Sequence, residues 1–409
     1  MALSKLKITE CRVCKSKKLK EILTLGNYYL SDFYSTNKLP KKYPMDLILC
    51  EKCMLLQLRH STPPKELYTP RYGYKSGINE TMRTELKEIS EKAIKRANLK
   101  IEKPVVIDIG SNDGTLLSNY PKKYFRIGVE PIKKLALESS SKANVVINDF
   151  FNSKKVIKEL GDRKASIITV ISCFYDMEDP NLFVSDLVEV LDEKGIIIIQ
   201  QNYLMGMLTL NAFDNIVHEH LEYYSLLSMD NLLRRHNLEV FDVELNNTNG
   251  GSFRTYIART GDRKISKSVL ELRKKELKFG MHKRKTYEDF AKRVTKIGSD
   301  INQFIKEESK KGKKVYVYGA STRGNTLLQY FKLNNKLVPK AVERNPEKFG
   351  KKIASLQIPI ISEDEARKEK PDYFLVLPWF FKEEFIKREK KFLDGGGHFI
   401  FPLPEFEII

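Results

Sequence analysis

Short apolar runs alternate with polar or amphipathic stretches through most of the chain beyond residue 100. Apolar runs of this length are typical of buried strands, and the stretches between them have the character of surface helices. Buried strands are therefore expected at residues 105–109, 124–129, 145–147, 166–171 and 196–199. Strands and helices in this alternation predict a parallel sheet with helices on both faces. A charged stretch at 78–100, with helix-spaced apolar residues, predicts a helix before the sheet.

A second α/β unit is expected after a helical connection. Residues 263–311 are rich in Lys and Glu with helical spacing, which predicts long exposed helices between two domains. Further strands are expected at residues 253–258, 315–318, 338–342, 373–377 and 399–401. A chain of 409 residues is too long for one ordinary core. We predict an α/β protein with three domains, at residues 1–70, 71–245 and 246–409.

Four of the five cysteines form two pairs near the N-terminus, Cys11-x-x-Cys14 and Cys50-x-x-Cys53. Two such knuckles supply four thiolates, which is the tetrahedral ligand set that zinc prefers. A redox pair and unrelated buried cysteines are the alternatives. Four protein ligands fill the coordination shell, so the predicted role of the zinc ion is structural. The fifth cysteine, Cys173, is expected to be a small buried residue rather than a nucleophile.

The net charge of +19 allows two interpretations. A basic chain attracts polyanions such as RNA or nucleotide-sugars. Lysines are spread along the whole chain, however, and no basic stripe is interleaved with aromatic residues, which favours an ordinary lysine-rich surface and no nucleic-acid partner. No apolar run has the roughly 20 residues of a membrane span, and the N-terminus lacks the apolar region of a secretion signal. We expect a cytoplasmic protein with no membrane partner.

A glycine-containing loop follows the first expected strand. Its candidate binding residues are Asp108, Gly110, Ser111, Asn112, Asp113 and Gly114. Glycines there allow a tight turn and a close approach of the backbone to a ligand. The spacing differs from that of dinucleotide-binding loops and the loop has no Lys or Arg, which favours the adenosyl and amino-acid parts of S-adenosylmethionine (SAM) over a pyrophosphate.

Residues at the ends of the next two strands support this interpretation. Glu130 follows the second strand, a position that suits hydrogen bonds to ribose hydroxyls. Asp149 and Phe150 follow the third strand, where the adenine would lie. The alternative is the same fold without a ligand.

Two of the six histidines flank a glutamate in His218-Glu219-His220, and Tyr223 and Tyr224 follow. Such a cluster can transfer a proton and stabilise an oxyanion, as carbon-acid chemistry requires. On a helix the two histidines would point about 200° apart, whereas in an extended segment they would share a face. The alternatives are a structural histidine pair and a metal site for which no third ligand is evident.

A second candidate binding loop follows the strand at 315–318. Ser321, Thr322 and Arg323 lie at the start of a predicted helix, where backbone N–H groups form an anion site. The loop lacks the lysine of an ATP-hydrolysing motif, which favours phosphate binding without hydrolysis. Glu343 ends the next strand, as Glu130 does in the first unit. This half could therefore hold a nucleotide, and the alternative is a domain that only packs.

These features occur together in the SAM-dependent sugar C-methyltransferases, which act on nucleotide-linked keto-deoxysugars, and the chain resembles that family over nearly its whole length. The cysteine segment is similar to their zinc-binding domain, and residues 106–115 are similar to their SAM loop. The most specific likeness is residues 215–225, with the core HEHxxYYS. Residues 249–254 and 318–325 resemble parts of their C-terminal Rossmann-like domain, which helps to bind the nucleotide-sugar. The resemblance implies a class I SAM-methyltransferase domain between the other two, in a monomer or homodimer.

The resemblance also implies roles for individual residues. His220 is the favoured base, and Glu219 would contact the sugar or orient a partner. A 4-keto group acidifies the neighbouring C3–H, His220 removes that proton, and the enolate carbon then takes the methyl group of SAM. Tyr223, Tyr224 and Asn202 are candidate donors to the enolate oxygen.

Two positions depart from the family pattern. Val217 stands where the best-known members have a tyrosine, and Tyr175 lies where they have an active-site histidine that touches the sugar. The sugar, the methylated carbon and the proton partner are therefore left open. The competing hypotheses are a SAM-dependent O- or N-methyltransferase of a small metabolite, an RNA-binding methyltransferase and a non-catalytic nucleotide-sugar binder.

Overall fold

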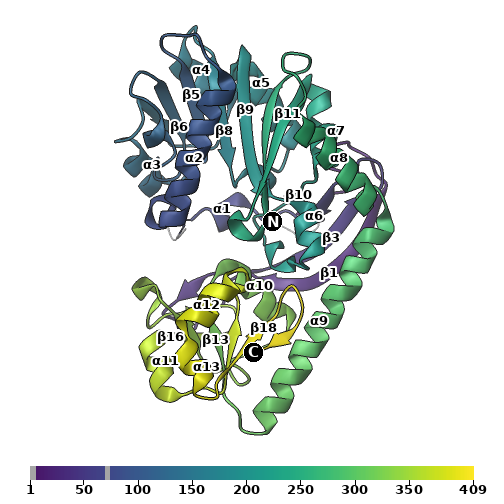
Figure 1. The fold of residues 1–409 in the computed structure, drawn as a ribbon, viewed down its shortest axis with the longest axis vertical. Coiled ribbons are helices and arrows are strands. Elements are labelled where there is room, and N and C mark those ends of the chain that lie inside the picture. The colour runs from purple at the N-terminus through teal and green to yellow at the C-terminus, as the bar shows by residue number, and fades with distance from the viewer. Residues whose placement is uncertain (1–5, 70–73) are drawn as a thin grey trace.

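The computed structural model describes residues 6–69 and 74–409. These residues form three sheets, of four, seven and eight strands, and Figure 1 gives the element labels. In that view the seven-stranded sheet lies above the eight-stranded sheet, and the long strands β1 and β3 of the four-stranded sheet run between them. Among the helices of the described residues, none combines the length and the apolarity that a membrane span requires.

The four-stranded sheet is antiparallel and contains strands from two distant parts of the chain. Its order is β1 (Leu19–Tyr29), β3 (Lys42–Cys50), β4 (Leu56–Leu58) and β10 (Glu222–Tyr223). Strand β10 belongs to the His-Glu-His segment. The N-terminal domain therefore holds the candidate catalytic segment through backbone pairing.

The seven-stranded sheet forms the core of the middle domain, here called the SAM domain. Its order is β11 (Leu238–Asn246), β12 (Ser252–Arg259), β9 (Leu191–Asn202), β8 (Ala165–Ile171), β5 (Val105–Ile109), β6 (Phe125–Val129) and β7 (Val145–Ile147). Strands β5 to β9 are parallel, as predicted. Strand β12 is antiparallel to both neighbours and lies beyond the expected boundary at residue 245, because the β11–β12 hairpin inserts its second strand beside β9.

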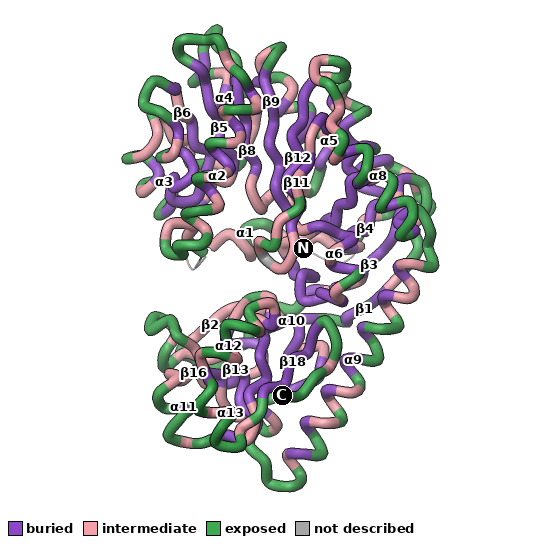
Figure 2. Tube along the Cα trace, viewed as in Figure 1, coloured by how far each residue is buried: buried purple, intermediate pink, exposed green. Residues whose placement is uncertain are grey.

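Helices cover both faces of this sheet (Figure 1) and enclose the buried strands (Figure 2). Helix α2 (Glu80–Ala97) begins after Asn79, whose side chain accepts hydrogen bonds from two N–H groups of the first turn. It buries Leu86, Ile89 and Ala93 against the sheet. The other helices of this region are α1 (Pro64–Leu67), α3 (Lys133–Ser139), α4 (Ser153–Leu160), α5 (Pro180–Val190), α6 (Leu204–Thr209), α7 (Leu226–Leu233) and α8 (Lys267–Phe279).

The eight-stranded sheet forms the second α/β unit. Its order is β19 (Glu407–Ile408), β18 (His398–Phe401), β17 (Tyr373–Val376), β13 (Val315–Tyr318), β14 (Ala341–Glu343), β16 (Ile358–Ser362), β15 (Lys352–Ile353) and β2 (Phe33–Tyr34). Its central strands are parallel. The edge strand β2 comes from the N-terminal domain. The accompanying helices are α10 (Thr322–Tyr330), α11 (Glu363–Glu369), α12 (Lys382–Arg388) and α13 (Lys390–Asp394).

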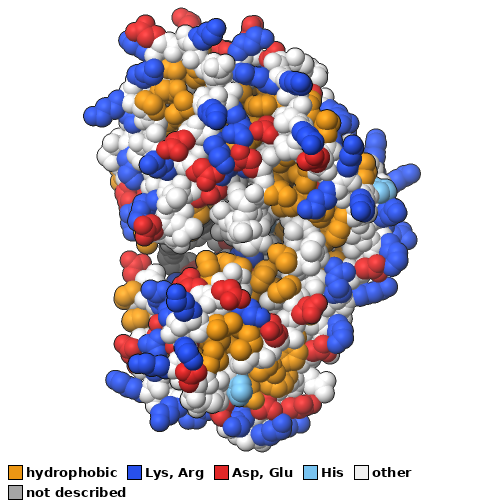
Figure 3. Space-filling view, in the orientation of Figure 1, with side chains coloured by type: hydrophobic (Ala, Val, Ile, Leu, Met, Phe, Trp, Pro, Cys, Tyr) orange, Lys and Arg blue, Asp and Glu red, His pale blue; other side chains and the backbone are white. Residues whose placement is uncertain are grey.

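The predicted helical connection consists of α8 and α9 (Arg284–Lys310), and α9 runs along the side of the molecule from the SAM domain to the C-terminal domain (Figure 1). Helix α9 is exposed on one face only, since Tyr287, Phe290 and Val294 are buried. The space-filling view is hollowed between the two domains that α9 connects (Figure 3). The chain thus encloses a cleft between the SAM domain and the C-terminal domain.

Candidate active site and zinc centre

The four cysteines predicted to bind zinc meet in one buried cluster. Their Sγ atoms all lie within 4.8 Å of one another. The Sγ atoms of Cys11 and Cys53 are 3.6 Å apart, and those of Cys14 and Cys50 are 3.4 Å apart. Zinc bound tetrahedrally at Zn–S distances of about 2.3 Å requires S–S separations of about 3.8 Å. The cluster therefore fits a zinc ion with four thiolate ligands.

The two cysteine knuckles have matching backbone turns. The N–H of Lys15 donates to the carbonyl of Cys11 (3.0 Å), and the N–H of Met54 donates to the carbonyl of Cys50 (2.9 Å). Lys15 and Met54 each follow the second cysteine of a pair, and both have positive φ, of 55° and 59°. Two equivalent turns thus present the two thiol pairs to one centre.

A cavity lies at the carboxyl ends of β5, β6 and β8, where parallel sheets bind ligands. Seven of the nine predicted SAM residues line it: Asp108, Gly110, Ser111, Asn112, Glu130, Asp149 and Phe150. Tyr68, Tyr74, Met82 and Leu86 complete one wall and were not predicted, because they precede the sheet in sequence. Cys173 also lines the cavity, and burial raises the pKa of its thiol, which keeps it protonated.

Four carboxyl groups of the described residues line this cavity, and Glu130 and Asp108 are held by hydrogen bonds at its strand ends. Glu130 accepts hydrogen bonds from the backbone N–H groups of Asn112 (2.9 Å) and Ile132 (2.8 Å), while burial raises its pKa. Asp108 accepts a hydrogen bond from the hydroxyl of Thr169 (2.6 Å), and burial raises its pKa to about 7. Acceptors of this kind fit the hydroxyl and ammonium groups of SAM.

Asp113 and Gly114 do not line the cavity but shape its loop. Asp113 accepts hydrogen bonds from the Thr115 hydroxyl (2.6 Å) and from the N–H of Gly77 (3.2 Å). Gly114 has φ +75°, and a Cβ there would lie 2.9 Å from the Cα of Ser139. The loop therefore needs glycine at this position for both conformation and space.

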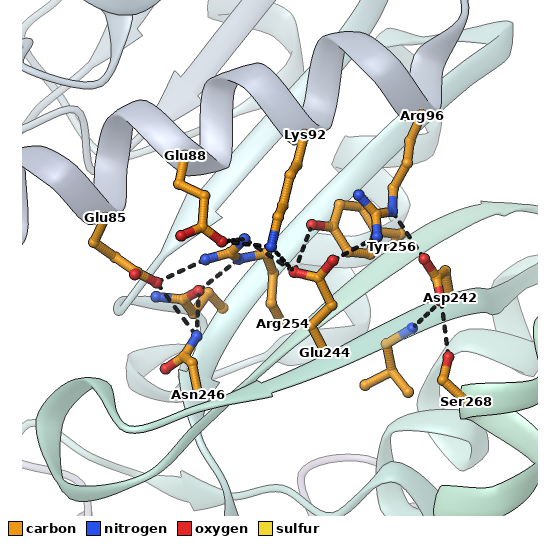
Figure 4. Close-up of polar contacts among 12 residues, drawn as sticks. Glu85, Glu88, Lys92, Arg96, Asp242, Glu244, Asn246, Arg254, Tyr256 and Ser268 are labelled. Carbon is orange, nitrogen blue, oxygen red and sulfur yellow. Dashed lines mark hydrogen bonds and ion pairs between the residues drawn. The ribbon is translucent and has the colours of Figure 1, made fainter.

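A charged network holds α2 against the sheet, beside the cavity wall that Met82 and Leu86 provide (Figure 4). Arg254 on β12 is 1% exposed and bonds with Glu85 (2.7 Å) and Glu88 (3.3 Å) of α2. It also bonds with Glu244 of β11 (3.1 Å). Arg254 belongs to the motif at 249–254, whose resemblance is to a C-terminal domain. In space, this arginine lies on β12, which pairs with β9 in the seven-stranded sheet.

The segment at 211–225 is the meeting point of the three domains. The carbonyl of Leu221 accepts a hydrogen bond from the N–H of Leu58 in the N-terminal domain (2.8 Å), and the N–H of Leu221 donates to Tyr175 of the SAM domain (2.8 Å). The hydroxyl of Thr326 in the C-terminal domain donates to the carbonyl of Ile216 (3.0 Å). These contacts fix the segment without a regular helix or strand over 216–221.

His220 is held in one orientation by its backbone neighbour. Its Nδ1 lies 2.8 Å from the carbonyl oxygen of Asn215, which can only accept a hydrogen bond, so Nδ1 carries the proton. The other ring nitrogen, Nε2, is then the basic one in the neutral ring. Burial lowers the pKa of His220 to about 4, opposed by the Asn215 hydrogen bond, and the charge of Arg323 lowers it further.

A small second cavity surrounds the His220 ring. It gathers three more predicted residues, Tyr175, Asn202 and Tyr223, and the ring centroids of Tyr175 and His220 are 4.2 Å apart. Asn202 donates from Nδ2 to the side-chain oxygen of Asn215 (2.9 Å). The cavity is also lined by Glu222, Tyr203, Leu204 and Met207, which were not predicted. Glu222 could have been suspected, because it lies inside the HEHxxYYS core.

The two cavities lie on either side of one short helical turn. Tyr175 and Asp176 are consecutive residues of the 3₁₀ turn η4 (Phe174–Asp176), and Tyr175 lines the small cavity while Asp176 lines the cofactor cavity. Burial and the nearby carboxylate of Glu219 raise the pKa of Asp176. Glu219 itself lines neither cavity.

His218 and Tyr224 lie outside both cavities. A turn closed by the hydrogen bond from the N–H of His220 to the carbonyl of Val217 (3.1 Å) separates the two histidines. His218 packs against Tyr43 of β3, at a ring-centroid distance of 6.3 Å, and burial lowers its pKa to about 4. Tyr224 packs against Phe174 at 5.3 Å.

The second candidate loop is engaged by the chain itself. Ser321 caps α10, accepting a hydrogen bond from the N–H of Gly324 (3.0 Å), and Thr322 is exposed. The Arg323 guanidinium bonds with Asp214 from Nη2 (2.7 Å) and Nε (3.0 Å). Glu343 pairs with Lys348 (3.0 Å). The structure thus brings Arg323 to the His220 segment, whereas Ser321 and Glu343 stabilise local turns.

Comparisons with known proteins divide the chain in the same order. Family models described as "Putative zinc binding domain", "Methyltransferase domain" and "C-methyltransferase C-terminal domain" match residues 11–68, 74–243 and 247–404. The C-methyltransferase NovU of Streptomyces niveus is 29% identical over 98% of this chain and 97% of its own length.

Solved structures are similar over a smaller share of the chain. A SAM-dependent methyltransferase from Clostridium acetobutylicum is 13% identical over 44% of this chain and 92% of its own, with a TM-score of 0.34. The magnesium protoporphyrin IX methyltransferase of Synechocystis, solved with bound SAH, is 14% identical over 46% of this chain and 91% of its own, with a TM-score of 0.36.

The sheet order, the cofactor cavity and the methyltransferase model define the chain as a SAM-dependent methyltransferase with a Rossmann-like fold. It carries a zinc-binding cysteine cluster in addition. All three domain models match in chain order, and a C-methyltransferase is similar over nearly the full length of the chain, so the comparisons support a C-methyltransferase built from three domains.

Proposed function

We propose that the protein methylates a carbon atom next to the ketone of a nucleotide-linked keto-deoxysugar, with His220 as the base. The observation that carries this proposal is the 2.8 Å contact between His220 Nδ1 and the carbonyl of Asn215. It commits the Nδ1 proton to the backbone and leaves Nε2 to accept a proton. A methyl acceptor with an ordinary hydroxyl or amine has less need of such a base.

The charge state of His220 suits proton abstraction. With a pKa of about 4 the ring is neutral near pH 7, so Nε2 is in the form that accepts a proton. A base works best when its pKa lies near the working pH. The diphosphate of a nucleotide-sugar would bring negative charge, which would raise the pKa of His220 toward that range. Substrate binding would thereby strengthen the base.

Donors around the small cavity suit the enolate that deprotonation creates. The Tyr223 hydroxyl is buried without a hydrogen-bond partner among the described residues, and it lines the cavity with Asn202 and Tyr175. A hydrogen bond from such a donor becomes stronger as negative charge develops on the ketone oxygen. When bound, SAM supplies an electrophilic methyl group. The turn η4 contributes Tyr175 to one cavity and Asp176 to the other. The methyl group and the carbanion would meet beside this turn.

The C-terminal domain would hold the nucleotide part in the cleft seen in Figure 3. Arg323 reaches the His220 segment from the start of α10 and is the strongest candidate for a diphosphate contact, with Ser321, Thr322 and Glu343 as candidate neighbours. The zinc ion has a structural role in this scheme, since four cysteines complete its shell. We expect the enzyme in the cytoplasm, where free thiols stay reduced.

Mass spectrometry with methyl-deuterated SAM and a panel of nucleotide-linked 4-keto-deoxysugars tests the reaction. We expect a labelled sugar whose fragments place the methyl group on carbon. Label on oxygen or nitrogen, or label on no sugar from a protein that still binds SAM, would rule out the proposed substrate class.

Hydrogen exchange tests the role of His220 separately. Wild-type protein in D₂O should exchange the C–H next to the ketone without methyl transfer, and His220→Gln should lose both exchange and turnover by roughly 10²–10⁴-fold. His282→Gln, at an exposed position, is the matched control and should behave as wild type. Undiminished exchange in His220→Gln would assign the base to another residue.

A further inference from the structure

The small cavity around His220 contains a carboxyl group for which the chain supplies no hydrogen bond. Glu222 lines this cavity and is 1% exposed. Neither of its carboxyl oxygens accepts a hydrogen bond within the described parts of the chain. A buried acceptor without a donor is costly, and such groups in native proteins usually have a ligand or water as partner.

One buried cation lies beside Glu222, and it comes from the first zinc knuckle. Arg12 stands between the ligands Cys11 and Cys14, and its Nε is 3.7 Å from Oε1 of Glu222. The side chains are 2% and 0% exposed. This separation balances charge but is too long for a hydrogen bond, so the carboxyl oxygens keep their capacity to accept.

The Arg12 side chain is fixed by the N-terminal domain. Its Nη1 donates to the carbonyl of Leu58 (2.6 Å), and its Nη2 donates to the hydroxyl of Ser61 (2.9 Å). Glu222 is fixed on the other side, because its Cα pairs with that of Gln57 where β10 joins β4. The knuckle and the sheet therefore hold the guanidinium and the carboxylate in register.

We propose that Glu222 is a substrate-binding residue that accepts a hydrogen bond from a hydroxyl or ammonium group of the sugar, and that Arg12 positions it. The proposal rests on the proposed function, since it assigns a contact to the same substrate. A ketone oxygen and a diphosphate are themselves acceptors, so neither suits a carboxylate beside a guanidinium. The zinc knuckle would in this way contribute to substrate recognition as well as to folding.

The test is Glu222→Gln, which keeps the side-chain shape and replaces one carboxyl oxygen by an NH₂ group. With a sugar that carries the recognised group, kcat/KM should fall by about 10- to 100-fold, because the substitution removes an acceptor from a buried hydrogen bond. The Kd for SAM and the zinc content should stay at wild-type values. Glu178→Gln is the matched control: Glu178 lies 4.0 Å from Arg12 but is exposed and outside both cavities, so its kcat/KM should stay within about twofold.

Sugar analogues identify the group. An analogue without the recognised hydroxyl or amine should react equally poorly with wild type and Glu222→Gln. Analogues that lack any other polar group of the sugar should preserve the difference in kcat/KM between wild type and Glu222→Gln. Comparing the hydroxyl sugar with its amino counterpart then separates the two donors. Arg12→Gln should raise KM in the same direction as Glu222→Gln, and Arg12→Lys should restore part of the loss.

Three results would overturn the proposal: unchanged kcat/KM in Glu222→Gln, a loss that no analogue shares, or a loss accompanied by weaker SAM or zinc binding. Failure of the proposed function is a separate result, because wild-type protein would then methylate no keto-sugar at all.

Discussion

The two α/β domains begin with the same local pattern and use it differently. The first four parallel strands have the same spatial order in each, β7-β6-β5-β8 and β16-β14-β13-β17. A glycine with positive φ follows the first strand, Gly110 at 72° and Gly319 at 88°. A glutamate stands at the end of the second strand, as Glu130 and Glu343. In outline, both domains have the arrangement with which parallel sheets bind ligands.

The surroundings of the two loops differ. Among the described residues, two backbone N–H groups donate to the Glu130 carboxyl group, which lines the cofactor cavity. Glu343 pairs with Lys348, whose Nζ also donates to the carbonyl of Ala320 in the loop (2.6 Å). The loop residue Arg323 is bonded to Asp214 of the SAM domain. In the second domain, charged groups of the chain itself therefore contact the loop arginine and the strand-end glutamate.

The comparison shows that a strand–glycine–helix pattern sets up a binding edge but does not decide what occupies it. Side chains from other parts of the chain decide whether this edge stays open. In the SAM domain they leave space, and in the C-terminal domain they connect the loop to Asp214 in the candidate catalytic segment. The second loop therefore positions the domain interface, and any nucleotide there must share Arg323 with Asp214.

The largest expected effect comes from breaking that tie with Asp214→Asn. Asp214 is 1% exposed and accepts hydrogen bonds from Arg323 and from the indole N–H of Trp379 (3.2 Å). Loss of one partner of a buried ion pair costs about 3–5 kcal/mol, and the partial exposure of Arg323 places the expected loss near 3. Trp379 is the single tryptophan, so its fluorescence during urea unfolding reports this junction directly.

Asp262→Asn is the control for this measurement. Asp262 pairs with Lys194 on the surface, where an ion pair is worth about 0–1 kcal/mol. Equal unfolding midpoints for the two variants would show that the Asp214–Arg323 contact does not hold the interface.

The sequence predicted the fold best where a strand is a short and mostly apolar run. The apolar runs at 105–109, 145–147 and 315–318 coincide with β5, β7 and β13. Strand β1 gave no such signal, because most of its residues are partly or fully exposed and its pairing with β3 shifts register twice. Two-residue strands such as β10 depend on a partner far away in sequence, which no local pattern specifies.

The same limit applies to the candidate site. Glycines and carboxylates at strand ends were sufficient to predict the cofactor cavity, because the carboxyl ends of parallel strands lie at one edge. The residue pattern alone did not distinguish the two histidines, because a single turn at 217–220 separates them, whereas the family resemblance favoured His220, which lines the small cavity. The contact between Arg12 and Glu222 was not predicted, because it depends on the pairing of β4 with β10, which are far apart in sequence.

The next effect is expected at the glycine that follows the first strand of each domain, Gly110 or Gly319. In both domains, the loop after the fourth parallel strand leaves little space for a Cβ atom at this glycine. A Cβ on Gly319 would lie 2.7 Å from the ring of Pro378, whereas a Cβ on Gly110 would lie 3.0 Å from the Sγ of Cys173. Left-handed backbone costs alanine about 1–2 kcal/mol at either site, and overpacking against a rigid ring adds about 1–3. Gly319→Ala should therefore lose about 3 kcal/mol of stability, and Gly110→Ala about 1–2.

Thermal unfolding with and without SAM separates these two variants further. Gly110 lines the cofactor cavity, so Gly110→Ala should also lose part of the stabilisation that SAM gives, while Gly319→Ala should keep its full SAM-induced shift. A normal SAM-induced shift in Gly110→Ala would mean that the ligand does not approach this turn.

The most specific effect is expected from the exchange of each strand-end glutamate for glutamine. Glu130→Gln keeps one acceptor oxygen but removes the charge that would bind ribose hydroxyls, and hydrogen bonds to charged groups are worth about 1.5–3 kcal/mol. The Kd for SAM should rise by about 10- to 100-fold by calorimetry. Glu343→Gln breaks only the contact with Lys348, so its Kd for SAM should stay within about twofold. Equal Kd values for SAM in the two variants would mean that the charge of Glu130 does not contribute to SAM binding.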